Sequence, residues 1–216
     1  MGPDPCPPPQ EVRPLAGALE AVPSFQGPGY AAKLATTKFG YPVLRNWCVW
    51  VEPAPENAVR GNRWLERWID AVDAAVQTWS DVVPLTRVAE PERAHVLVFR
   101  KRPPLRQLAS GWRASNGRSL LKLVEVRQPT GWQQQPGWQK QPRVKVLVSP
   151  ELRAAALQAT ALHELGHAFG LWAHSDQPDD AMAVSQGKSP VLELSARDKT
   201  TINWLRSQPT SFGLSP

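Results

Sequence analysis

Histidine and cysteine are scarce in this 216-residue chain, which contains four histidines and two cysteines. Cys6 and Cys48 are too few for a disulfide framework, so a hydrophobic core must hold the fold together. Apolar residues make up 42% of the chain, and its ten tryptophans add to a sizeable core. We expect a mobile thiol at Cys6 and a buried one at Cys48, and the sequence leaves a single bridge between them open.

The chain also lacks long apolar runs. No stretch approaches the roughly 20 consecutive apolar residues that a transmembrane helix needs. The first residues, MGPDPCPPPQEVRP, lack the basic start and the apolar stretch of a signal peptide. We therefore expect no membrane segment, and nothing in the sequence as given is expected to direct export.

Acidic residues are almost absent from the middle of the chain. Between Arg100 and Pro150 there are eleven lysines and arginines against one acid, Glu125, and the whole chain has a net charge of +6. Three tryptophans lie in the same segment, and basic residues interleaved with aromatic ones can bind nucleic acid. No nucleic-acid-binding motif accompanies this charge, so we interpret it as solvated strand faces and loops.

Composition divides the chain into three parts. The first thirty residues contain eight prolines and four glycines and show no periodicity. Residues 1–40 are therefore expected to form a flexible or loosely docked extension. The folded domain is expected over residues 41–210, followed by a short tail, 211–216.

Apolar and alternating runs predict strands within residues 41–53, 94–100, 119–127 and 142–148. The glutamine-rich stretch between the last two is expected to be a loop. Helical spacing predicts a long amphipathic helix over 62–83, with its tryptophans in the core.

Two further helices are signalled by their first residues. One should start with Ser149 as N-cap and Pro150 at the first helical position, and run for about twenty residues into the histidine-rich region. The other is marked by Ser195, with Asp198 three residues later.

Three of the four histidines lie within residues 162–176, LHELGHAFGLWAHSD. His163 and His167 are four residues apart, which places them within about 6 Å of each other on one helix face. They can therefore share one metal ion. Two neutral imidazoles suit zinc, and in an HExxH pair the glutamate, here Glu164, acts on the metal-bound water instead of binding the metal.

The residues after the helix strengthen this interpretation. Gly170 can adopt the left-handed conformation that ends a helix and reverses the chain, which would bring His174 toward the same ion. Met182, in the sequence DDAMAV, can provide an apolar floor beneath a zinc site, although ordinary core packing is the alternative.

HELGHAFGLWAHS followed by DAM resembles the metzincin clan of zinc endopeptidases, whose pattern is HExxHxxGxxH with a Met-turn, and within it the matrixin-like proteins. Upstream, AVQTWSDVVPLTRV and ERAHVLVF are similar to the end of the first matrixin helix and to the strand after it. The resemblance covers roughly residues 42–206. It implies an α+β fold with a twisted mixed sheet, an antiparallel edge strand, two long helices, and a small C-terminal subdomain with the Met-turn and a final helix.

The resemblance also implies a function: a metalloendopeptidase, a hydrolase that cleaves peptide bonds of proteins. One catalytic Zn²⁺ would be bound by His163, His167 and His174, and Glu164 would be the general base for a zinc-bound water. The substrate would lie extended along SLLKLVEVR, and residues 183–190 would select side chains. The resemblance suggests a secreted or extracytoplasmic protein, and we expect a monomer.

The chain departs from the family pattern at the third histidine. The expected place is Ala173, and His174 comes one residue later, so a bulge at Trp172 and Ala173 must absorb the shift. Asp176 is a competing ligand, and further candidates are Asp179, Asp180 and Glu193. No latency motif of the family is present, and whether residues 1–40 act as a propeptide stays open. The alternative function is a catalytically silent zinc-bearing module whose basic segment, residues 100–150, binds nucleic acid or another polyanion.

Overall fold

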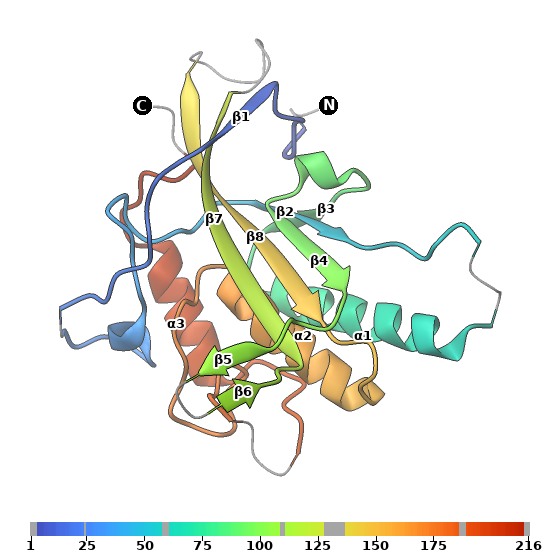
Figure 1. Ribbon diagram of the computed structural model, residues 1–216. Helices are drawn as coiled ribbons and strands as arrows, with labels where there is room; N and C mark the ends of the chain where they lie inside the picture. The colour runs from blue at the N-terminus through green and yellow to red at the C-terminus, as the bar shows by residue number, and fades with distance from the viewer. Residues whose placement is uncertain are drawn as a thin grey trace.

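The computed structural model describes residues 4–23, 25–57, 61–108, 111–127, 137–185 and 189–213. A six-stranded mixed sheet forms its centre, with the strand order β1-β7-β8-β4-β2-β3 (Figure 1). Its strands are β1 (Glu11–Pro14), β2 (Trp47–Val51), β3 (Leu85–Arg87), β4 (Val96–Arg100), β7 (Gly117–Arg127) and β8 (Trp138–Val148). β2 is parallel to β3 and β4, and β4 is parallel to β8, whereas β7 is antiparallel to β8 and β1.

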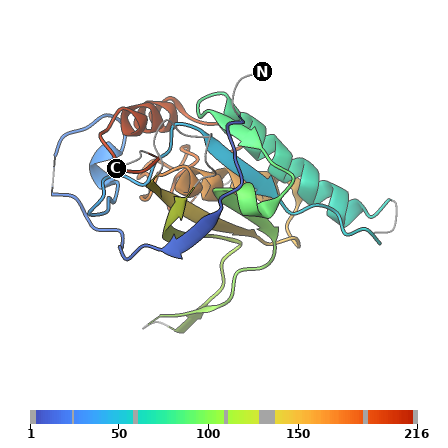
Figure 2. The same cartoon turned by 90° about the horizontal axis from the view of Figure 1, so that it is seen from above.

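Each predicted strand contains or overlaps an observed one, namely β2, β4, β7 and β8. Most of the expected glutamine-rich loop, residues 128–136, lies outside the described residues, and β8 already begins at Trp138. A separate hairpin, β5 (Arg106–Leu108) with β6 (Gly111–Arg113), connects β4 to β7. In both views it projects from the sheet beside the end of β7 that carries Gly117 (Figures 1 and 2).

The described helices are α1 (Arg63–Ser80), α2 (Ala154–Ala168) and α3 (Ala196–Arg206), with short 3₁₀ turns at η1 (Ala31–Lys33) and η2 (Pro91–Arg93). α1 packs against α2, and α2 packs against β7 and β8. The mixed sheet and helices match the α+β class predicted from the sequence. None of the described helices is long and apolar enough to cross a membrane.

Helix α1 is anchored by two buried tryptophans. Trp68 Nε1 donates to the Val148 carbonyl at 3.2 Å, and Trp79 Nε1 donates to the Leu162 carbonyl at 2.8 Å. The second bond ties α1 to α2 one residue before His163. Trp64 was also expected in the core, but it is 63% exposed, because the first turn of α1 extends past the sheet (Figure 1).

The start of α2 differs from the prediction, whereas its end and the start of α3 agree with it. Ser149 N donates to the Asn116 carbonyl at 2.8 Å, so this residue continues the extended chain of β8, and α2 begins only at Ala154. Gly170 ends α2 with a φ of 111°, a left-handed value that favours glycine. Ser195 and Asp198 form the predicted capping box of α3.

The N-terminal segment was expected to be flexible or loosely docked, and its described residues include a strand that is docked on the sheet. Gln10 N donates to the Arg127 carbonyl at 2.9 Å and Leu15 N to the Leu123 carbonyl at 3.0 Å, which fixes β1 beside β7. SLLKLVEVR is therefore an edge strand only in its first half. β1 has only four residues and all of them are exposed, so it leaves no alternating pattern of apolar residues in the sequence.

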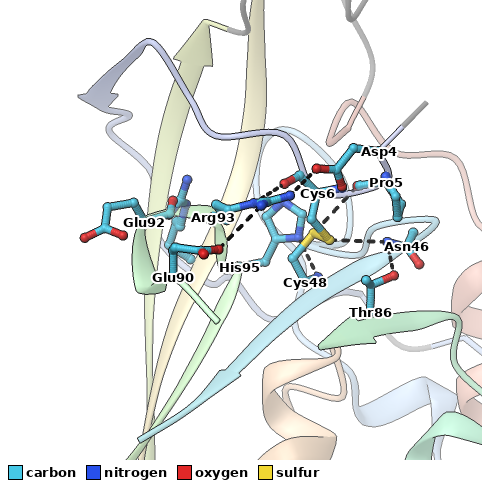
Figure 3. The surroundings of a disulfide bond; sticks show 11 residues. Asp4, Pro5, Cys6, Asn46, Cys48, Thr86, Glu90, Glu92, Arg93 and His95 are labelled. Carbon is cyan, nitrogen blue, oxygen red and sulfur yellow. Dashed lines mark hydrogen bonds and ion pairs between the residues drawn. A yellow bond between two sulfur atoms is a disulfide. The ribbon is translucent and has the colours of Figure 1, made fainter. Parts of the chain in front are cut away.

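A disulfide between Cys6 and Cys48 ties this segment to β2, with the two Cα atoms 5.8 Å apart (Figure 3). The bridge that the sequence left open is thus formed, and the expected mobile thiol at Cys6 is wrong. Arg93 donates to the Cys6 carbonyl at 2.7 Å and pairs with Asp4. His95 Nδ1 accepts a hydrogen bond from Cys48 N at 3.0 Å.

Removing this disulfide is expected to lower the free energy of unfolding by about 2–4 kcal/mol, because the bridge restricts the unfolded chain. The two cysteines are 42 positions apart in the sequence, so the closed loop is long. Urea unfolding of the Cys6→Ser/Cys48→Ser variant measures the loss. Equal midpoints for the variant and the oxidised parent would contradict the expectation.

Candidate metal centre

Three histidines meet at the end of α2. His163 and His167 come from consecutive turns of this helix, and His174 comes from the chain that follows Gly170. Their potential ligand nitrogens all lie within 4.8 Å of one another. The three side chains named from the sequence are therefore close enough to bind a metal ion together.

Backbone carbonyls orient the first two rings. His163 Nδ1 lies 2.8 Å from the Ala181 carbonyl oxygen, and His167 Nδ1 lies 2.7 Å from that of Leu171. Because a carbonyl oxygen only accepts, each Nδ1 must carry the proton and donate it. The lone pair on each Nε2 is then left for a metal, an orientation that second-shell hydrogen bonds commonly give to histidine ligands.

The histidines are held in their neutral form by burial. Burial lowers the pKa of His163 to about 4 and that of His167 to about 3, and it also lowers the pKa of His174. A metal ion at neutral pH would therefore not have to displace protons from these rings. Three neutral imidazoles are a donor set that zinc accepts with a further position left open, so the residues present fit this ion.

Two tight turns lie between Gly170 and His174, at the residues where a bulge was expected. Trp172 N donates to the Gly170 carbonyl at 2.8 Å, and Ala173 N donates to the Leu171 carbonyl at 2.9 Å. Such three-residue turns shorten the path of the chain. The His174 ring consequently stacks on His163, with centroids 5.2 Å apart and an interplanar angle of 23°.

Two of the competing carboxylates, Asp176 and Asp180, are engaged elsewhere. Asp176 is exposed and pairs with Lys33 at 3.2 Å and with Arg197 at 3.0 Å. Asp180 is buried and accepts hydrogen bonds from Ser175 and Ser195. Within the described part of the chain, the close group of potential ligands contains none of the candidates Asp176, Asp179, Asp180 and Glu193.

Glu164 lies beside the histidines and is only 8% exposed. Ser119 Oγ, from β7, is 2.7 Å from its Oε2 and 2.8 Å from its backbone oxygen. Burial raises the pKa of Glu164 to about 7, and the Ser119 hydrogen bond and the charge of Arg118 limit that rise. The carboxyl group is thus held in place and is tuned toward the range of a general base at neutral pH.

Gly117 makes room for this carboxylate. A Cβ at this position would lie 2.6 Å from Glu164 Cγ and 2.8 Å from Oε1. Neither Gly117 nor Ser119 was predicted from the sequence as a site residue. Both are small, and because they are two apart on a strand, their side-chain positions lie on the same face, here toward α2. This pair of small residues on one strand face is the sequence signal that could have identified them.

Met182 packs against the helix that carries His163 and His167. Met182 is fully buried, and a Cβ on Gly166 would lie 2.2 Å from its sulfur, so the side chain packs directly on α2 between the two histidine positions. Ala181 N donates to Asp198 Oδ2 at 2.8 Å, and the Tyr30 hydroxyl donates to Asp198 Oδ1 at 2.7 Å. Tyr30 and Asp198 are therefore linked to His163 through Ala181, a role that the sequence did not reveal.

The histidines and Glu164 line a cavity of about 450 Å³. A larger cavity, about 960 Å³, lies at the disulfide and contains none of these residues. No protein-family model matches this chain, and a search of the curated proteins gives no match either.

Replacing the third histidine tests the metal centre. His174→Ala should weaken zinc binding by at least about 100-fold, because the loss of a ligand costs more than the loss of its supporting hydrogen bond. Asp176→Ala, the matched control in the same loop, should keep the zinc. Competition with a chromophoric chelator measures both affinities. Zinc retained without His174 and lost without Asp176 would show that the ligands have been misassigned.

Proposed function

We propose that this protein is a zinc-dependent endopeptidase of the metzincin type, similar to matrixins. The observation that carries the proposal is the convergence of three neutral imidazoles beside a buried glutamate. This arrangement suits metal-assisted hydrolysis, because the metal ligands and the base are separate groups. The mixed sheet, the two long helices and the buried methionine after the third histidine are compatible with the metzincin fold.

Zinc held by His163, His167 and His174 would polarise the peptide carbonyl and acidify water. The chain's own residues would then move the proton. Glu164 accepts it from the attacking water and passes it to the departing amine nitrogen. Ser119 holds Oε2 of this carboxylate, so Oε1, which faces Gly117, is left for the water.

The open edge of β7 offers a place for an extended peptide. The carbonyls of Leu123 and Arg127 face β1, and alternate residues of an antiparallel strand face the same neighbour. Gly117, Ser119 and Leu121 therefore face the same edge, where no described strand pairs with them. A peptide added there would be recognised through its backbone and would lie next to Glu164.

The Cys6–Cys48 disulfide supports a location in an oxidising compartment, where such bonds form and persist. This agrees with the secreted or extracytoplasmic location that the family resemblance suggests. A protein that acts outside the cytoplasm would also benefit from the covalent attachment of its N-terminal segment.

The role of Glu164 is tested by Glu164→Gln, which keeps the shape of the side chain but removes the base. The variant should bind zinc as the parent does and cleave a quenched peptide library about 10² to 10⁴-fold more slowly. Metal content and turnover are measured on the same preparation. Undiminished cleavage would exclude this mechanism.

Gly117→Ala tests whether the room beside Glu164 matters. The added methyl group should displace the carboxylate and slow cleavage, by up to about 100-fold for a shift near 1 Å, without loss of zinc. Circular dichroism verifies the fold, and metal analysis verifies the centre. Parental turnover in a folded, zinc-loaded variant would show that the carboxylate position does not depend on this glycine.

A further inference from the structure

We propose that the cleft, the cavity lined by the three histidines and Glu164, selects peptides with acidic side chains next to the cleaved bond. Arg106 and Arg118 would bind these side chains. The proposal rests on the proposed peptidase function, and it names the substrate class of the same site. It also gives a substrate-binding role to two cations of the basic segment, residues 100–150.

The charged residues around the cleft are unbalanced. Two arginines, Arg106 and Arg118, line the same cavity as the three histidines, and Glu164 is the single acid among the lining residues. The nearest acid of the histidine loop, Asp176, is already paired with Lys33 and Arg197. Within the described residues, the cleft therefore presents an excess of positive charge.

Arg106 is free to meet a substrate. Its side chain is exposed and forms no hydrogen bond or ion pair with another described residue. It lies on β5, in the hairpin that projects beside the Gly117 end of β7 (Figure 1).

Arg118 approaches the cleft from the edge strand. It is half-buried, and its Nη2 donates to Ser115 Oγ at 3.4 Å, a long bond to a neutral partner. Its remaining N–H groups can form charge-assisted hydrogen bonds to a carboxylate, which an arginine fork suits well.

An extended peptide along Gly117–Leu121 would pass between these two arginines and the histidines. An acidic side chain near the cleaved bond gains an ion pair with either arginine, whereas a basic side chain is repelled. An exposed ion pair changes affinity by up to about fivefold, and salt weakens it. The expected selectivity is therefore graded, not absolute.

Three quenched peptides of otherwise identical sequence test the inference. The residues that flank the cleaved bond, one on each side, are both glutamate in the first peptide, both glutamine in the second and both lysine in the third. The zinc-loaded parent should cleave the glutamate peptide about three- to tenfold faster, by kcat/KM, than the glutamine peptide, and the lysine peptide slowest. The order should flatten in 1 M salt, where charges are screened beyond about 3 Å.

Arg106→Glu should favour the lysine peptide over the glutamate peptide, and Arg106→Gln should reduce the difference between them. Lys145→Glu is the matched control, because it reverses an exposed cation on β8 that does not line the cleft. It should keep the parental order. An unchanged order in both Arg106 variants would overturn the assignment.

Binding separates this inference from the proposed function. Labelled glutamate and glutamine peptides are titrated with zinc-loaded Glu164→Gln protein and followed by fluorescence anisotropy. Tighter binding of the glutamate peptide supports the inference, whether or not the parent cleaves it. Absence of cleavage by the parent would exclude only the peptidase function. Equal binding and equal cleavage overturn the inference and leave the peptidase intact. Salt-sensitive binding of a DNA oligomer without discrimination between the peptides also counts against it.

Discussion

The hydrogen bond from His163 Nδ1 to the Ala181 carbonyl is the interaction on which the site depends. Without it the ring could present either nitrogen to a metal. Ala181 is held in turn by the buried carboxylate of Asp198 in α3, and Asp198 is bonded to Tyr30 in the N-terminal segment. Three parts of the chain, far apart in sequence, therefore determine the orientation of one imidazole.

Strand β7 connects this centre to the rest of the molecule. Its first residues, Gly117 and Ser119, accommodate and hold Glu164, while its last residues pair with β1. The uncovered part of its edge thus lies next to the three histidines and Glu164. Because β1 is tethered through Cys6–Cys48, the N-terminal segment limits how far this open edge extends.

Features that depend on neighbours in sequence were predictable. The four-residue spacing of His163 and His167 placed both on one helix face, and a glycine at position 170 signalled the end of that helix. Long-range contacts were not predictable: Tyr30 and Asp198 are 168 positions apart, and Ser119 and Glu164 are 45 apart. The predicted helix start at Ser149 failed because a hydrogen bond to Asn116, the residue before β7, keeps this residue extended, which overrides the local N-cap preference.

We propose that the three histidines hold a zinc ion that serves peptide hydrolysis. Zinc content can be measured together with cleavage of a quenched peptide library before chelation, after chelation, and after zinc is returned. We expect one zinc ion per chain, cleavage that stops when the metal is removed, and recovery when it is restored. Full cleavage by the zinc-free protein would exclude this function, and so would a zinc-loaded protein that cleaves no member of the library.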